Sequence, residues 1–260
     1  MRPRRIVAAA LLVAFVAVTL VLPTQDVMAT DVLDTFAAPS AAHLLGTDNL
    51  GRDVYSLMVS GCLRTIVVVV VSGVISFVGG VVLGLLAGWR GGAVEAAVTL
   101  LADLTIVVPS FILALIFAGI FGLTPLGAGV VLGIGNMGDY AVQATALTKR
   151  VLGEEFVEVE RTMGISGWRI ALRHLLPNIV RPLSTYLAAR ASSVTVQYAS
   201  LAFIGVGADI SNPDWGTMLY QYRTFVLTSP SLVILPMAGI AVLAVFFQLL
   251  FDRGGADDGA

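Results

Sequence analysis

Long apolar runs separated by short polar segments make up most of this chain. Several runs are long enough to cross, as helices, a hydrocarbon core about 30 Å thick. They predict six membrane-spanning helices, at residues 6–22, 66–88, 96–121, 126–147, 183–204 and 232–250. Only 12% of the residues are charged and the mean hydropathy is +0.92, whereas a soluble domain carries about 25% charged residues. The pattern therefore predicts an all-α membrane protein with several spans.

The first apolar run has two interpretations. Arg2, Arg4 and Arg5 precede it, and Val27-Met28-Ala29 after it is similar to a small-residue cleavage site. A run of this length suits either a long signal peptide or a short span. On these residues alone, a cleaved signal peptide and a retained helix are both open.

A polar segment and a glycine stripe add detail to this prediction. Residues 23–64 are polar and acidic, and residues 49–63 within them predict a short amphipathic helix at the membrane interface. In the following span, Gly80, Gly84 and Gly88 recur every fourth residue, which lets another helix approach closely. We therefore expect a tightly packed helix pair there.

The longest charged segment of the chain lies between the fourth and fifth predicted spans, at residues 154–177. Phe156, Val159 and Met163 recur at helical spacing and predict a helix with one apolar face. The remaining surface of this helix is charged and carries Glu154, Glu155, Glu158 and Arg161. The segment is either an ordinary solvated loop or a docking element for a soluble partner.

A turn and a second helix are predicted in the rest of this segment. Gly164 ends the first helix, because glycine accepts the positive φ of a helix end. Ser166 is positioned to cap a second helix over residues 168–176, and Pro177 is expected to stop it. The segment is thus predicted to be a helix, a glycine turn and a helix.

The distribution of positive charge predicts the topology. With the N-terminus in the cytoplasm, most of the 15 Lys and Arg residues lie on the cytoplasmic side. Arg52, Arg64 and Arg223 then lie outside, and Arg190 lies within the membrane. Both termini and the segment at 154–177 are therefore predicted to be cytoplasmic, within reach of a soluble partner.

Known catalytic and nucleotide-binding patterns are lacking. The stretch Gly133-Ile-Gly-Asn-Met-Gly138 matches G-x-G-x-x-G, but it lies in an apolar span rather than after a strand, so close helix packing is the better interpretation. The only lysine, Lys149, follows Thr148 rather than the glycine of a phosphate loop. Metal ligands are sparse, with a single cysteine and two histidines far apart in sequence, Cys62, His43 and His174. We expect no catalytic residue, metal site or cofactor in this chain.

Four polar residues inside the predicted spans are candidates for function. Asp103 and Arg190 are ionisable, and a charge at mid-bilayer costs about 2.5–3.5 kcal/mol on insertion scales, so such residues usually face the bundle interior or a cavity. Asn136 and Asp139 lie beside the glycine-rich stretch. These four residues are candidates for a polar pathway, and structural pairing between helices is the alternative.

The segment at 154–177 resembles the cytoplasmic "EAA" loop of binding-protein-dependent ABC importer permeases. The glutamate, glycine and proline of that motif match Glu158, Gly164 and Pro177, and RTMGISGWRIALRHLLPNI is similar to the dipeptide, oligopeptide and nickel branch. Further matches are HLLGTDNLGRD at 43–53, GWRGG at 88–92, SLAFIGVG at 200–207 and Trp215-Gly216. The resemblance covers roughly residues 43–253. It departs from the motif at Val159 and Glu160, where the family has two alanines.

This resemblance implies a fold and an assembly. The fold is a six-helix transmembrane bundle of the type I ABC importer permease (MetI-like) kind, with a cytoplasmic coupling loop. The implied division is an N-terminal helix and extracytoplasmic segment at 1–64, the permease domain at 65–253, and a cytoplasmic tail at 254–260. It also favours the retained N-terminal helix. The docking residues for the ATPase would be Glu155, Glu158, Arg161, Gly164, Ser166, Arg169 and Pro177.

The implied function is that of the second, C-type permease subunit of an ATP-driven importer in the plasma membrane of a prokaryote. Its partners would be a homologous permease, two ATP-binding subunits that carry ATP and Mg, and an extracytoplasmic binding protein, with no nucleic acid. Peptides are the first substrate class, and nickel or a metal chelate is the second. An ion-coupled secondary transporter using Asp103, Asp139 and Arg190 is the alternative, although we see none of the internal repeat usual in such carriers. An intramembrane enzyme lacks any supporting signature.

Overall fold

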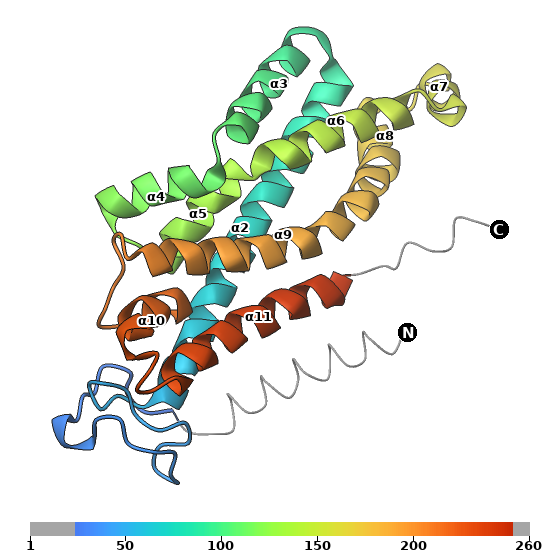
Figure 1. Ribbon diagram of the computed structural model, residues 1–260. Coiled ribbons are helices and arrows are strands. Elements are labelled where there is room, and N and C mark those ends of the chain that lie inside the picture. Colours follow the sequence, from blue (N-terminus) through green and yellow to red (C-terminus); the bar gives the residue numbers. More distant parts are fainter. Residues whose placement is uncertain (1–23, 252–260) are drawn as a thin grey trace. The chain divides into compact units, whose positions relative to one another are not determined.

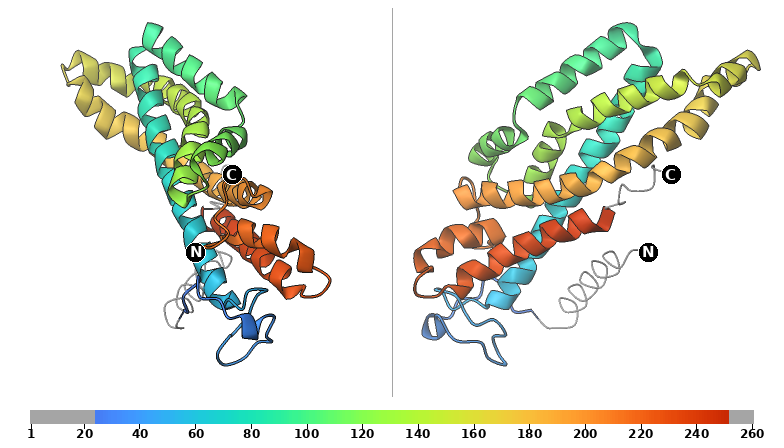
Figure 2. Two further views of the ribbon diagram at one scale, coloured as in Figure 1. Left: turned by 90° about the vertical axis from the view of Figure 1, so that its left-hand side faces the viewer. Right: turned by 45° about the vertical axis from the view of Figure 1, so that its right-hand side comes forward.

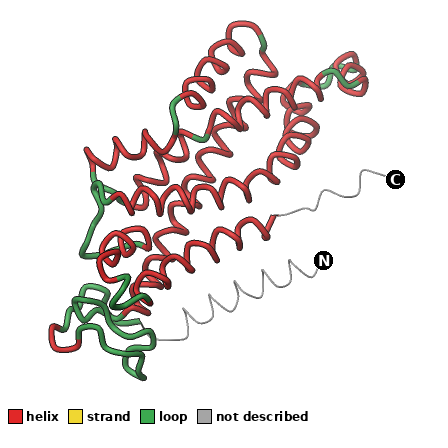
Figure 3. The backbone as a smooth tube through the Cα atoms, viewed as in Figure 1, coloured by secondary structure: helices red, strands yellow, loops and turns green. Residues whose placement is uncertain are grey.

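The computed structural model describes residues 24–251, which form helices joined by turns and loops, without a β-strand (Figure 1, Figure 3). The predicted all-α class is therefore confirmed for this part of the chain. The predicted first span at 6–22 and the tail from residue 252 lie outside the described residues. The chain forms two compact units, described one at a time: the first holds residues up to Val69 with Leu115–Ala128 and Ala191–Leu250, and the second holds Val70–Ala114 and Gly129–Arg190.

The first unit is built around the buried indole of Trp215. Trp215 begins α10 (Trp215–Tyr222), and its Nε1 donates a hydrogen bond to the carbonyl of Met58 at 3.0 Å. Gly239 of α11 (Ser231–Phe251) lies so close that an added Cβ would sit 3.0 Å from the ring. The first turns of α2 (Val54–Arg90) complete this core, whose buried members are Val54, Leu57, Cys62, Trp215, Met218, Tyr222, Leu232, Leu243 and Phe246.

The second unit is held together by close packing of α2 against α6 (Met137–Leu152). A Cβ added to Gly84 would lie 2.4 Å from the Cβ of Ala144, and the same construction places Gly80 against Tyr140 and Gly88 against Thr148. The predicted glycine stripe is thus confirmed as a helix-packing surface. Helix α3 (Gly92–Val107) also packs along α6.

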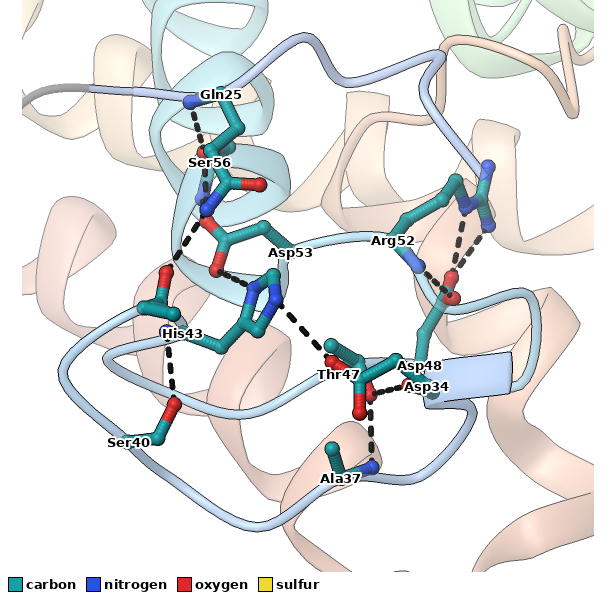
Figure 4. Close-up of polar contacts among 11 residues, drawn as sticks. Gln25, Asp34, Ala37, Ser40, His43, Thr47, Asp48, Arg52, Asp53 and Ser56 are labelled. Carbon is teal, nitrogen blue, oxygen red and sulfur yellow. Dashed lines mark hydrogen bonds and ion pairs between the residues drawn. The ribbon is translucent and has the colours of Figure 1, made fainter. Parts of the chain in front are cut away.

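A buried ion pair organises the polar segment ahead of α2 (Figure 4). Arg52 is 2% exposed, and its Nε donates to Oδ2 of the fully buried Asp48 at 2.8 Å. The Tyr222 hydroxyl donates to the same oxygen at 2.8 Å. Burial, and then the Asp48 carboxylate, raise the pKa of the Tyr222 phenol. The segment is therefore a folded part of the first unit and is anchored to α10.

The amphipathic helix predicted at 49–63 does not exist as a separate element. Helix α2 begins at Val54 and continues to Arg90, so most of that stretch is the start of a 37-residue helix. Asp53 caps it, accepting from the Ser56 backbone N–H at 2.8 Å. No proline lies between Val54 and Arg90, so nothing forces a break between the predicted interfacial and spanning parts.

The third predicted span is broken. Residues 96–121 fall into α3 and α4 (Ser110–Phe121), which are bent by 75° at Pro109 (Figure 3). Pro109 disfavours helical geometry in the residue before it, and Val108 is extended, with φ −87° and ψ 113°. The break is therefore a local consequence of the proline.

The fourth predicted span is also divided. It comprises α5 (Pro125–Gly135) and α6, with Asn136 between them at φ −96° and ψ 0°. The Asn136 side chain donates to the Leu132 carbonyl at 2.7 Å and is nearly buried. The same carbonyl also accepts from the Asn136 backbone N–H at 3.0 Å, so the asparagine side chain adds a second donor where α5 ends.

Fewer helices than expected are suited to crossing a membrane by length and composition. Among the described residues, Val54–Arg90 and Ser231–Leu249 qualify, and the bent pair α3–α4 counts as a third if it crosses as one span. Helix α9 (Leu176–Ile204) is long but carries Arg190 and many hydroxyl side chains. The structure therefore supports an all-helical membrane protein, and the count of six spans goes beyond it.

Candidate functional site

The segment at 154–177 projects from the second unit between the C-terminal end of α6 and the N-terminal end of α9 (Figure 1, Figure 2). We call this short helical segment the excursion. Helix α7 (Glu155–Thr162) is held down by Val157, which is fully buried. Val157 packs in a cluster with Ile170, Leu175 and Ile179. The excursion is thus a folded element rather than a solvated loop.

The apolar face predicted for α7 is largely exposed. Phe156, Val159 and Met163 are 43%, 55% and 74% exposed, and Trp168 after the turn is 73% exposed. Exposed apolar side chains that gather on one short segment are typical of an interaction surface. We call Phe156, Val159, Met163 and Trp168 the apolar edge.

The turn after α7 is a Schellman motif centred on Gly164. The Ile165 N–H donates to the Glu160 carbonyl and the Gly164 N–H donates to the Arg161 carbonyl, both at 3.0 Å. Gly164 has φ +76°, and an added Cβ would meet no atom within 4 Å. The left-handed glycine turn predicted from the sequence is confirmed, and the glycine is required by backbone geometry alone.

The second helix differs from the prediction. Ser166 occupies the N-cap position of α8 (Gly167–Ile170), but its side chain makes no capping hydrogen bond. The chain then passes through a π-turn (Ala171–Leu175) into α9, so the prediction that Pro177 stops the helix is wrong. Proline lacks an N–H and crowds the carbonyl four residues earlier. The π-turn just ahead widens the backbone ring, since the Leu176 N–H bonds to the Ala171 carbonyl five residues back.

The charged candidates of this segment lie on its surface. The exposed residues are Glu155, Glu158, Arg161, Ser166, Arg169 and Pro177. The structure adds contacts that the sequence pattern did not indicate: Glu160 meets His174, and Gly167 packs against the Trp89 ring at the end of α2. These depend on how α7 and α8 fold together, which helical spacing within either helix does not specify.

Among the intramembrane candidates, Arg190 forms an ion pair with Asp139, which joins α9 to the first turn of α6. The two side chains are 35% and 31% exposed. Asp103 forms no ion pair among the described residues and lies on an exposed face of α3 with Glu95 and Thr99, in a shallow depression of about 490 Å³. The structure thus brings together two of the four residues. The glycine-rich stretch that holds Asn136 packs closely, with Gly133 against Ile75, as the packing interpretation expected.

Comparison with known proteins identifies relatives over most of the chain. Residues 80–254 match the family described as binding-protein-dependent transport system inner membrane component. The glutathione transport system permease protein GsiD of Pectobacterium atrosepticum is 31% identical over 82% of this chain and 71% of its own length. The probable D,D-dipeptide transport system permease protein DdpC of Escherichia coli is 32% identical over 89% of this chain and 78% of its own length. The dipeptide transport system permease protein DppC of Alkalihalophilus pseudofirmus is 29% identical over 82% and 70%.

Proposed function

Because the chain belongs to the family of binding-protein-dependent transport system inner membrane components, we propose that it is the translocating subunit of an ATP-driven importer of short peptides. Three relatives at about 30% identity are named for the transport of glutathione or dipeptides, and these substrates share a peptide backbone. No relative cited above is named for nickel, so peptides are the substrate class we retain.

The observation that carries the proposal is the apolar edge on a folded, projecting helix. This edge would dock on an ATP-binding subunit, with Glu155, Glu158, Arg161 and Arg169 around it supplying charge complementarity. Gly164, Ser166 and Pro177 would set the backbone path. Since the chain has no phosphate-loop lysine, the chemistry of ATP hydrolysis and its Mg would belong to that partner.

The remaining architecture follows from the same proposal. Six spans, with both termini in the cytoplasm, would place α7 on the cytoplasmic side, as the distribution of Lys and Arg favours. A homologous permease would cover exposed apolar surface of this chain, and an extracytoplasmic binding protein would deliver the peptide. The Asp139–Arg190 pair, one-third exposed, would face the pathway rather than lipid, because a charge in hydrocarbon is costly.

The proposal is tested by placing a charge on the apolar edge. Met163→Asp should reduce co-purification of the ATP-binding subunits at least roughly tenfold, because a buried, unpaired carboxylate would replace an apolar contact. Leu227→Asp is the control, since Leu227 is 94% exposed and belongs to the other unit. Both variants should insert into the membrane normally. Undiminished recruitment by Met163→Asp would overturn the docking role of the apolar edge.

A further inference from the structure

The two helical parts of the excursion are joined by a polar contact between Glu160 and His174. Glu160 Oε1 lies 2.9 Å from His174 Nε2, with the two side chains 22% and 23% exposed. The Phe156 ring lies against the imidazole at a tilt of 52°, with centroids 5.3 Å apart. Since Glu160 and Phe156 belong to α7 and His174 to the π-turn, this contact links the helix of the apolar edge to the start of α9.

The chemistry of the contact makes it sensitive to protonation. His174 Nε2 lies within ion-pair distance of Glu160 Oε1 but is buried and makes no hydrogen bond of acceptable geometry among the described residues, so the contact depends on charge. The second oxygen of Glu160, Oε2, is buried and has no hydrogen-bond donor among the described residues. A buried anion that lacks donors is costly unless a cation is close. A cationic ring therefore holds this carboxylate more strongly than a neutral ring does.

Among the described residues, no other charged side chain forms an ion pair with Glu160 or His174. Glu155, Glu158 and Arg161 of α7, Arg169 of α8 and Arg173 of the π-turn are exposed, and none has an ion pair within the described residues. On the neighbouring α6, Lys149 pairs with Glu95 of α3 and Arg150 is exposed.

The backbone is fixed at both ends of the contact. The Glu160 carbonyl accepts the Schellman hydrogen bond from Ile165. The His174 carbonyl accepts from the side chain of Asn178 at 2.8 Å. A change in the strength of the side-chain contact is therefore expected to change the orientation of α7 relative to the start of α9. Position 160 is also one of the two where the chain departs from the motif that it resembles.

We propose that His174 is a positioning residue that clasps Glu160 and so holds α7 in its docking orientation, more firmly with a protonated ring. This inference rests on the proposed docking of the apolar edge. Histidine is the side chain that ordinarily changes charge between pH 5 and 8. The clasp would therefore couple ATP hydrolysis to transport more tightly when the cytoplasmic side is acidic, and less tightly as its pH rises.

The test uses the assembled importer in inside-out vesicles, with the lumen held at one pH and the cytoplasmic face stepped from pH 6 to pH 8. The measured quantity is dipeptide transported per ATP hydrolysed. In the wild-type protein this ratio should fall roughly fivefold across the range, as expected for a charge-assisted contact reverting to a neutral one. His174→Gln keeps a donor without a titrating ring, so its ratio should be nearly independent of pH. Glu160→Gln removes the anion and should flatten the profile as well.

The control is His43→Gln. His43 is the only other histidine of the chain and contacts Asp34 and Asp53 in the segment ahead of α2. This variant should keep the wild-type pH profile. A wild-type ratio that does not change with pH, or an unchanged profile in both His174→Gln and Glu160→Gln, would overturn the clasp. If the clasp is overturned but Met163→Asp still reduces recruitment of the ATP-binding subunits, only the clasp is wrong. If Met163→Asp leaves recruitment unchanged, the proposed docking of the apolar edge is wrong.

Discussion

At the scale of single residues, the structure distinguishes buried ion pairs, which stabilise the fold, from ion pairs exposed on the surface. Arg52 and Asp48 are buried together, and Asp48 also accepts a hydrogen bond from the Tyr222 hydroxyl. The Arg52 guanidinium also donates to Gln221 at 2.9 Å. Lys149 and Glu95 form a pair of similar geometry that is 50% and 30% exposed. Burial decides their energetic weight, because removing one partner of a buried pair leaves an uncompensated charge.

We therefore expect Arg52→Met to lower the free energy of unfolding by about 3–5 kcal/mol, since Asp48 would remain buried without its cation. Lys149→Met should change it by no more than about 1 kcal/mol, because its pair is exposed to solvent. Thermal unfolding of the purified subunit in detergent compares the two variants. Equal losses would show that the segment ahead of α2 is not anchored by this pair.

At the scale of helices, glycines fix how closely α2 and α6 approach. An added Cβ on Gly84 would lie 2.4 Å from Ala144 Cβ and 2.5 Å from the Ala141 carbonyl oxygen, whereas one on Gly73 would meet nothing within 4 Å. Both glycines belong to α2, so they share the same helix propensity. Their difference is purely one of packing.

Gly84→Leu should consequently force the helix pair apart and cost about 1–3 kcal/mol or more, the usual penalty of overpacking. Gly73→Leu is the matched control and should leave the isolated subunit as stable as the wild type. Denaturation midpoints of the two variants give the comparison. If both were equally tolerated, α2 and α6 would not pack as the structure shows.

The breaks within the third and fourth predicted spans also arise from single residues within the helices. Pro109 and Asn136 divide runs that hydropathy alone presents as continuous. Pro177 does not break its helix, because the π-turn just ahead of it accommodates the missing N–H, and Pro182 lies inside the continuous α9. A proline therefore marks a potential break, and the neighbouring backbone decides whether a break occurs.

At the scale of the whole molecule, the proposed topology assigns the two polar loops to opposite sides of the membrane. In a Cys62→Ala background, Ser166→Cys should react with a membrane-impermeant thiol reagent only from the cytoplasmic side. Leu227→Cys, in the loop between α10 and α11, should react only from outside. Both positions are exposed in the chain by itself, so in vesicles that carry this subunit without its partners a lack of labelling would reflect sidedness rather than burial. Labelling of both from one side would rule out the proposed orientation.

The sequence by itself determined the class of the protein, the glycine stripe of α2, the left-handed turn at Gly164 and the lack of a phosphate loop. Each depends on composition or on residues within a few positions of one another, where backbone sterics and helical periodicity act directly. The family resemblance seen in the sequence is confirmed by the relatives for the same reason, since it rests on contiguous motifs.

Only the tertiary structure decided which charges meet. Arg190 pairs with Asp139 rather than Asp103, Arg52 is buried beside Tyr222, and Glu160 finds His174. Such contacts join residues that are distant in sequence, or that lie on different helices whose rotation is set by packing elsewhere. Spacing along one helix specifies which residues share a face, but the identity of the opposing side chain depends on how the helices are rotated and packed against each other.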